Sequence, residues 1–208
     1  MLILACVAAI LTALAAVQWW SWHQLSASTD YVRQLATTGW IDDEPTWQRY
    51  RRSLHVEALL EPQDARVYWQ LGELAYWQAA GLRLWPERQR EAMETARRYY
   101  LRAVGLAPSD GVLLARVSHR LVESDRALAV TLMRRAMDVA PFEPLVEYEL
   151  ADVGLQVYDG LDEPMKRSFE RMLAHAMQNY RLAPKIKRMA RDDGRPELLV
   201  QLGSAATD

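Results

Sequence analysis

Four histidines are the side chains in this sequence best suited to metal binding or proton transfer: His23, His55, His119 and His175. A metal site on a helix needs ligands three or four residues apart, and no histidine here has another histidine or a cysteine at that spacing. The single cysteine, Cys6, excludes an intrachain disulfide and a thiolate metal cluster. We therefore expect neither a metal site nor a cofactor.

Other catalytic arrangements are also missing from the sequence. It contains no Gly-rich phosphate-binding loop and no nucleophile elbow. The acidic run Asp42-Asp43-Glu44 precedes Pro45, which is typical of a helix start or a loop. We therefore expect a protein that is not an enzyme, with an active site assembled from distant residues as the alternative.

Length and composition favour one membrane segment and one folded domain. The chain has 208 residues, half of them apolar and a quarter charged, which is a globular composition and excludes a disordered chain. The formal net charge of -2 gives no overall preference for nucleic acid.

The N-terminal segment has the composition of a membrane anchor. Residues 1–20 carry no charged side chain, and twenty helical residues reach roughly 30 Å, the thickness of the hydrocarbon layer. Trp19, Trp20 and Trp22 follow where an interfacial aromatic belt belongs. The sequence thus predicts an uncleaved transmembrane helix over residues 1–22 of a single-pass inner (plasma) membrane protein.

Two alternatives compete with this anchor: a signal peptide cleaved after Ala13-Leu14-Ala15, and a buried core helix. Few basic residues flank the span, so the positive-inside rule gives little information on its orientation. Because a very short N-terminal tail is easily left in the cytoplasm, we expect the large domain in the periplasm.

After the anchor, a recurring junction indicates repeated helices. In each junction an apolar helix end is followed by proline: Leu59-Leu60-Glu61-Pro62, Gly105-Leu106-Ala107-Pro108, Asp138-Val139-Ala140-Pro141 and Arg181-Leu182-Ala183-Pro184. The prolines are 46, 33 and 43 residues apart, near the period of about 34 residues of tetratricopeptide repeats. We expect each proline to begin the next helix at its first turn.

Small and large residues alternate at fixed spacing inside these helices. The clearest sets are Ala96, Tyr100, Ala103 and Pro108, then Ala129, Met133, Ala136 and Pro141. Tyr68, Leu71 and Gly72 fit the helix before the first set, and two looser fits are Leu114, Val117, Ser118 and Leu150, Ala151. In these positions the chain resembles the tetratricopeptide (TPR) family, well over residues 65–157, in degenerate form over 30–64 and poorly over 165–184.

This resemblance implies an all-α fold: an N-terminal transmembrane helix and a TPR-like α-α superhelix with degenerate capping helices. The expected divisions are the anchor (1–22), a linker with degenerate N-terminal helices (23–64), the TPR-like domain (65–202) and a flexible tail (203–208).

The resemblance also implies a partner-binding groove, because the first helices of stacked pairs line a concave surface. By repeat position that groove displays Arg66, Trp69, Glu73, Tyr76, His119, Glu123, Tyr148 and Asp152. Aromatic and acidic side chains of this kind suit an extended peptide or a partner helix. An apolar insertion adds a second contact, through Leu82, Leu84 and Trp85, or else folds back over the repeat edge.

The C-terminal helices are basic. Between Pro164 and Arg191 eight basic residues face the single acid Glu170, a net charge of 8 − 1 = +7. An anionic partner there is the alternative to a solvated surface. No recognition motif accompanies these charges, so we expect no nucleic acid.

Together these features predict a non-catalytic, membrane-anchored scaffold or adaptor for a cell-envelope assembly machine, such as polysaccharide biosynthesis or export. In layout the chain looks like the small anchored TPR-containing accessory proteins of exopolysaccharide biosynthesis. A periplasmic chaperone-like peptide-binding module, in secretion or cytochrome maturation, is the alternative, and an adaptor facing the cytoplasm is a third.

Overall fold

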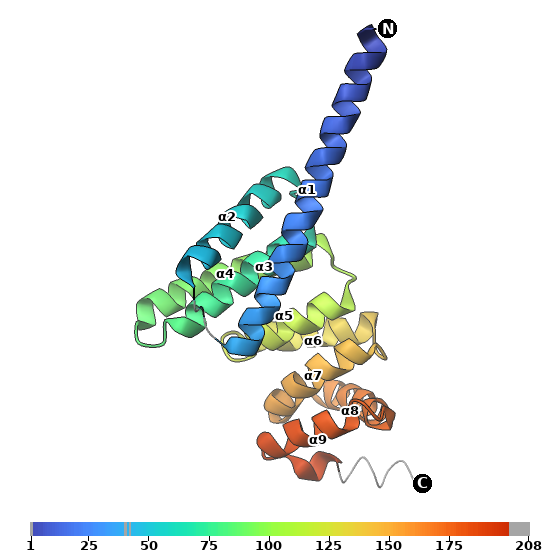
Figure 1. Cartoon of the computed structure of the whole chain (residues 1–208). Coiled ribbons are helices and arrows are strands. Elements are labelled where there is room, and N and C mark those ends of the chain that lie inside the picture. The colour runs from blue at the N-terminus through green and yellow to red at the C-terminus, as the bar shows by residue number, and fades with distance from the viewer. Residues whose placement is uncertain (1, 40, 42, 200–208) are drawn as a thin grey trace. The chain divides into compact units, whose positions relative to one another are not determined.

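The structure, a computed structural model, describes residues 2–39, 41 and 43–199 (Figure 1). Side chains are described for the same residues, apart from 2–5, 17, 18, 21, 22 and 24. Every regular element in this described part is a helix, which confirms the predicted all-α class. The predicted flexible tail, residues 203–208, lies outside the described residues.

The chain divides into two compact units, Met1–Leu106 and Ala107–Asp208. This boundary falls inside the range 65–202 that the sequence analysis assigns to one repeat domain. The first unit consists of α1 (Leu2–Thr38), α2 (Glu44–Leu60), α3 (Ala65–Gly81) and α4 (Pro86–Leu106). The second consists of α5 (Gly111–Leu121), α6 (Arg126–Val139), α7 (Pro144–Val157), the 3-10 turn η1 (Tyr158–Gly160), α8 (Glu163–Gln178), α9 (Ala183–Asp192) and a last helical turn over 196–199.

Aspartates begin most of these helices. Their side chains accept hydrogen bonds from backbone N–H groups of the first turn, a contact worth about 1 kcal/mol each. The capping residues of α2, α3, α5, α6 and α8 are Asp43, Asp64, Asp110, Asp125 and Asp162.

Three of the four junction prolines differ from the prediction that each one begins the next helix. Only Pro184 lies in the first turn of a helix. Pro62, Pro108 and Pro141 lie in the turns between helices. Since proline cannot donate a backbone hydrogen bond, these three residues end one helix and leave the start of the next to its capping residue.

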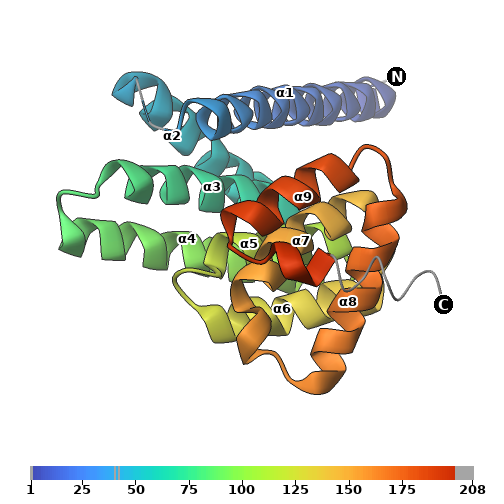
Figure 2. The ribbon, with the colours of Figure 1, turned by 90° about the horizontal axis from the view of Figure 1, so that it is seen from below.

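In the first unit, α3 and α4 pack side by side as a helical hairpin (Figure 2). The residues singled out in α4, Ala96, Tyr100 and Ala103, have no exposed surface. Gly72 of α3 lies against the Tyr100 ring: a Cβ at this position would stand 2.5 Å from the ring carbons Cδ1 and Cε1. The absence of a side chain at Gly72 therefore sets how closely the two helices approach.

In the second unit, alternate helices lie next to one another. α5 packs against both α6 and α7, α7 also packs against α8 and α9, and α6 contacts α8. The pair α7 and α8 repeats the close approach of the first hairpin, because a Cβ on Gly154 would stand 2.1 Å from the Phe169 ring. The helices α5, α7 and α9 thus form one layer, with α6 and α8 in another.

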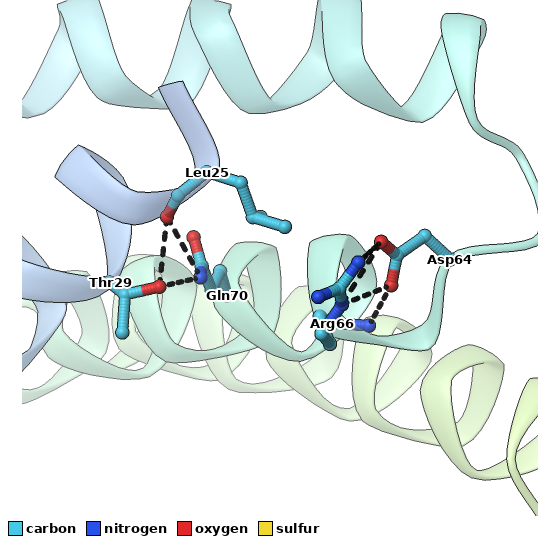
Figure 3. A network of polar contacts seen from close by, with 5 residues as sticks. All are labelled: Leu25, Thr29, Asp64, Arg66 and Gln70. Atoms are coloured by element: carbon cyan, nitrogen blue, oxygen red, sulfur yellow. Dashed lines mark hydrogen bonds and ion pairs between the residues drawn. The ribbon is translucent and has the colours of Figure 1, made fainter. Parts of the chain in front are cut away.

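The first helix, α1, is held in the first unit by its C-terminal half. Leu25, Tyr31, Val32 and Leu35 are buried and belong to one core with residues of α2 and α3. Gln70 of α3 adds polar contacts: its Nε2 donates to the Leu25 carbonyl oxygen at 3.3 Å and also hydrogen-bonds the Thr29 hydroxyl (Figure 3). The N-terminal half projects away from α2, α3 and α4 (Figure 1).

The predicted transmembrane anchor over residues 1–22 is contradicted. Over the residues that the structure describes, no helix combines the length and apolar character that a membrane span requires. α1 also does not end after the tryptophans: it continues to Thr38 through a segment that carries the ion pair Asp30–Arg33 (2.7 Å). The apolar residues of this continuation are used to pack α2 and α3 and not to meet lipid.

The predicted location fails with the anchor. The prediction of a single-pass inner-membrane protein with a periplasmic domain required that span, and so did the predicted membrane contact through residues 1–22. The described side chains of the N-terminal half of α1 are exposed, with Ile10, Leu11 and Leu14 each 60% exposed. The side chains of residues 1–5, 17, 18, 21 and 22 lie outside the described part.

Candidate functional site

A histidine between two carboxylates is the most organised polar group in the second unit. His119 of α5 lies between Glu149 and Asp152, which are three residues apart on α7. Its Nδ1 is 2.7 Å from Glu149 Oε2, and its Nε2 is 3.0 Å from Asp152 Oδ2. Since carboxylates only accept hydrogen bonds, both ring nitrogens donate and the ring is a cation.

The pKa of His119 follows from this geometry. Burial of the ring opposes its charge, but the hydrogen bonds to Asp152 and Glu149 outweigh burial and raise the pKa from 6.5 to about 9. The side chain is only about a third exposed (32%), so water screens these contacts incompletely. His119 is therefore positively charged throughout the neutral pH range.

The two carboxylates are held from both sides. Arg116, one turn before His119 on α5, places its Nε 3.8 Å from Glu149 Oε1. Gln156, one turn after Asp152 on α7, donates from Nε2 to Asp152 Oδ2 at 2.9 Å. Glu149 and Asp152 are thus fixed in position before any partner arrives, which lowers the entropy cost of binding one.

The helix α9 completes this surface. The Lys185 ammonium lies 5.1 Å from the centre of the Tyr148 ring, within cation–π range. Burial, followed by the charges of Glu149 and Asp152, raises the pKa of Tyr148 above its usual value, so its phenol stays protonated and able to donate. Burial, then the charges of Asp152 and Asp192, raises the pKa of Asp193 at the end of α9.

We call this surface the α5–α7–α9 face and define it by Arg116, His119, Tyr148, Glu149, Asp152 and Lys185. It presents fixed positive and negative groups and one aromatic ring from three helices. His119 is poorly suited to proton transfer at neutral pH, because its nitrogens carry protons and its pKa lies about two units above pH 7.

Three of the residues predicted for the groove meet in this face: His119, Tyr148 and Asp152. The fourth from this unit, Glu123, is exposed in the turn that follows α5. Sequence reasoning missed Arg116, Glu149 and Lys185. The spacing of Arg116 with His119 and of Glu149 with Asp152, three residues in each case, was the available signal, because such pairs share one side of a helix.

The groove residues predicted in the first unit have mixed roles. Arg66 forms an ion pair with Asp64 at the start of α3 (2.6 Å; Figure 3). The Trp69 ring packs 5.2 Å from that of Tyr100, and the Tyr76 ring meets Trp77 edge-on.

Glu73 is buried and does not line the predicted groove. Only 2% of this residue is exposed, and its Oε1 accepts a hydrogen bond from the Tyr100 hydroxyl at 2.7 Å. Its carboxylate therefore stabilises the contact between α3 and α4 and does not face a partner.

The predicted insertion contact lies in the α3–α4 connection. Leu84 is 84% exposed and Trp85 52% exposed, whereas Leu82 is half-buried. On α9, Lys187, Arg188 and Arg191 are exposed, as a surface for an anionic partner requires. Both partner contacts stay predictions.

The described residues include no group of three or more histidine, cysteine or acidic side chains placed to hold a metal ion. Comparisons of the chain with protein-family models, with curated proteins and with solved structures give no match.

Proposed function

We propose that this protein is a non-catalytic adaptor built of stacked helix pairs, which binds a segment of a partner protein on its α5–α7–α9 face. The observation that carries the proposal is His119, held as a cation by carboxylates of a different helix within a partly exposed surface. The close-packed pairs at Gly72 and Gly154 support a TPR-like repeat arrangement, in which alternate helices line the binding surface.

The chemistry of the face defines the kind of partner. Lys185 offers positive charge at one edge, while Tyr148 offers an amphipathic ring of the type that contributes most energy at protein interfaces. Glu149 and Asp152 are already neutralised by His119 and Arg116. The face therefore fits an extended segment that carries an acidic residue beside an apolar one.

Affinity capture of the partner with paired variants tests this function. The double variant Tyr148→Ala/Lys185→Ala removes the ring and the ammonium above it. The matched control, Arg126→Ala/Arg135→Ala, removes two exposed arginines of α6, outside the face. We expect one partner at fixed stoichiometry, retained by the control and bound at least tenfold more weakly by the face variant.

Two results would count against the proposal, provided that thermal melting shows both variants folded. Equal retention by both variants would show that the face is not the binding site. Capture of many unrelated chains in place of one partner would favour the chaperone-like peptide-binding alternative.

A further inference from the structure

The first unit holds a cavity that the proposed adaptor function does not use. It lies between α2, α3 and α4 and has a volume of about 360 Å³. Cavities of this size hold small molecules. At roughly 30 Å³ for an atom the size of a water molecule, this one has room for about 12 non-hydrogen atoms.

The interior of the cavity is apolar. Leu71, Leu74 and Ala75 of α3 and Ala92 of α4 line it and are buried. Trp47 of α2 forms another part of the wall, and its indole N–H donates to the Leu74 carbonyl oxygen at 3.3 Å. Because this hydrogen bond satisfies the indole, Trp47 presents only its ring to the cavity.

One part of the wall is fixed by a hydrogen bond between α2 and α4. The Nδ1 of His55 lies 2.7 Å from the Arg51 carbonyl oxygen, which only accepts, so Nδ1 carries a proton. The other nitrogen, Nε2, lies 3.1 Å from the Tyr99 hydroxyl, within hydrogen-bond distance. His55 and Tyr99 thus add a polar wall to the cavity.

The charges around the cavity favour an anion. Arg51 of α2 and Arg88 of α4 line it from different helices, and Glu91 is the only acid in the lining. Two positive charges and one negative charge give a net +1. Among the described residues, neither guanidinium has a carboxylate within ion-pair distance, and Arg51 is placed over the Trp47 ring at 5.2 Å. Both are available to a ligand.

We propose that this cavity binds a small organic anion with an apolar body, a carboxylate on a hydrocarbon chain of about eight to ten carbons. The chain lies on the leucine and alanine floor beside Trp47, and the carboxylate meets Arg51 and Arg88. The inference is independent of the α5–α7–α9 face, which lies in the other unit.

Isothermal titration calorimetry on the full chain tests the proposal with three probes: octanoate, 1-octanol and octylammonium. They share one apolar chain and differ in the charge of the head group. We expect octanoate to bind at least tenfold more tightly than 1-octanol, the effect of a charged hydrogen bond, and octylammonium to bind most weakly. Equal affinity for octanoate and 1-octanol, or no binding of octanoate, would overturn the proposal.

Paired variants locate the site. Arg51→Gln/Arg88→Gln removes both charges of the cavity, whereas Arg52→Gln/Arg83→Gln removes two exposed arginines of the same unit outside its lining. We expect the first pair alone to weaken octanoate binding by about tenfold or more, with 1-octanol binding unchanged. Equal effects of the two pairs would show general attraction to a basic surface and would also overturn the assignment.

Discussion

The ring of Tyr100 lies directly against Gly72, so that no side chain larger than hydrogen fits between them. The hydroxyl of the same tyrosine donates a hydrogen bond to the carboxylate of the buried Glu73, which follows Gly72 on α3. One aromatic side chain therefore fixes both the separation and the register of α3 and α4. This contact is local to one hairpin and can be tested by single substitutions.

Gly72→Ala should destabilise the first unit. The added Cβ meets the Tyr100 ring at 2.5 Å, and the ring cannot move without losing its bond to Glu73. We expect a loss of about 1–3 kcal/mol in the free energy of unfolding and a melting temperature lower by several degrees. Gly105→Ala is the control: nothing lies within 4 Å of its added Cβ, so a helix-propensity gain of about 0.5–1 kcal/mol is expected. Equal melting temperatures for the two variants would contradict the packing.

His119 should make the stability of the second unit depend on pH. Its folded pKa, raised to about 9, lies above the ordinary value of 6.5. Its contribution is therefore complete below about pH 6.5 and is lost as the pH rises to about 9. With allowance for the part of the ring that water reaches, the loss is about 1–3 kcal/mol. Urea denaturation between pH 6 and pH 10 measures it.

His119→Gln is the control for this titration. Glutamine can still hydrogen-bond a carboxylate but has no charge to lose, so the decline between pH 6.5 and pH 9 should disappear. An undiminished decline in the variant would assign the pH dependence to another group.

Glu57 of α2 should titrate in a lower range. Burial, then the neighbouring charges of Glu61 and Asp64, raises its pKa from 4.5 to about 7, and only 2% of the residue is exposed. Because the folded state holds this proton more firmly, the stability of the first unit should fall as the pH rises from about 4.5 to 7 and then level off. Glu57→Gln should be more stable than the natural chain at pH 8 by about 1–3 kcal/mol, and nearly equal to it at pH 4.5. Urea denaturation measures both stabilities. If the difference in free energy of unfolding between Glu57→Gln and the natural chain is the same at pH 8 and at pH 4.5, the raised pKa of Glu57 is refuted.

Much of the helix packing could be predicted because it follows local rules. Ala96, Tyr100 and Ala103 recur at helical spacing, and they are buried where that spacing implies. In α7 the pattern fits loosely at Leu150 and Ala151, and it does not single out Gly154, against which the Phe169 ring of α8 packs. The offset between α7 and α8 depends on the turn η1 (Tyr158–Gly160) that joins them. The sequence does not show how such a turn sets the register of one helix against the other.

The predicted anchor failed for a different reason. A run of apolar residues resembles a membrane span whether it ends a helix or begins a longer one, and α1 continues to Thr38. Leu25, Val32 and Leu35 are buried in the core of the first unit. Their role depends on contacts with α2 and α3, which no local pattern reveals.

The α5–α7–α9 face was found in part. Three of the residues chosen by repeat position, His119, Tyr148 and Asp152, lie close together in the structure. The partners Arg116 and Glu149 require the relative rotation of α5 and α7, and Lys185 requires the placement of α9 over Tyr148. The spacing of Arg116 with His119, and of Glu149 with Asp152, shows that each pair shares one side of its helix, but packing decides which side faces the other helix.

Photo-cross-linking from the face tests the adaptor account most directly. Tyr148 and Arg135, in separate chains, are replaced by the photoreactive residue p-benzoylphenylalanine, and the adducts formed with the captured partner are identified by mass spectrometry. The account predicts an adduct with one partner from position 148 and none from position 135 on α6. Cross-linking from position 135 but not from position 148 would contradict it.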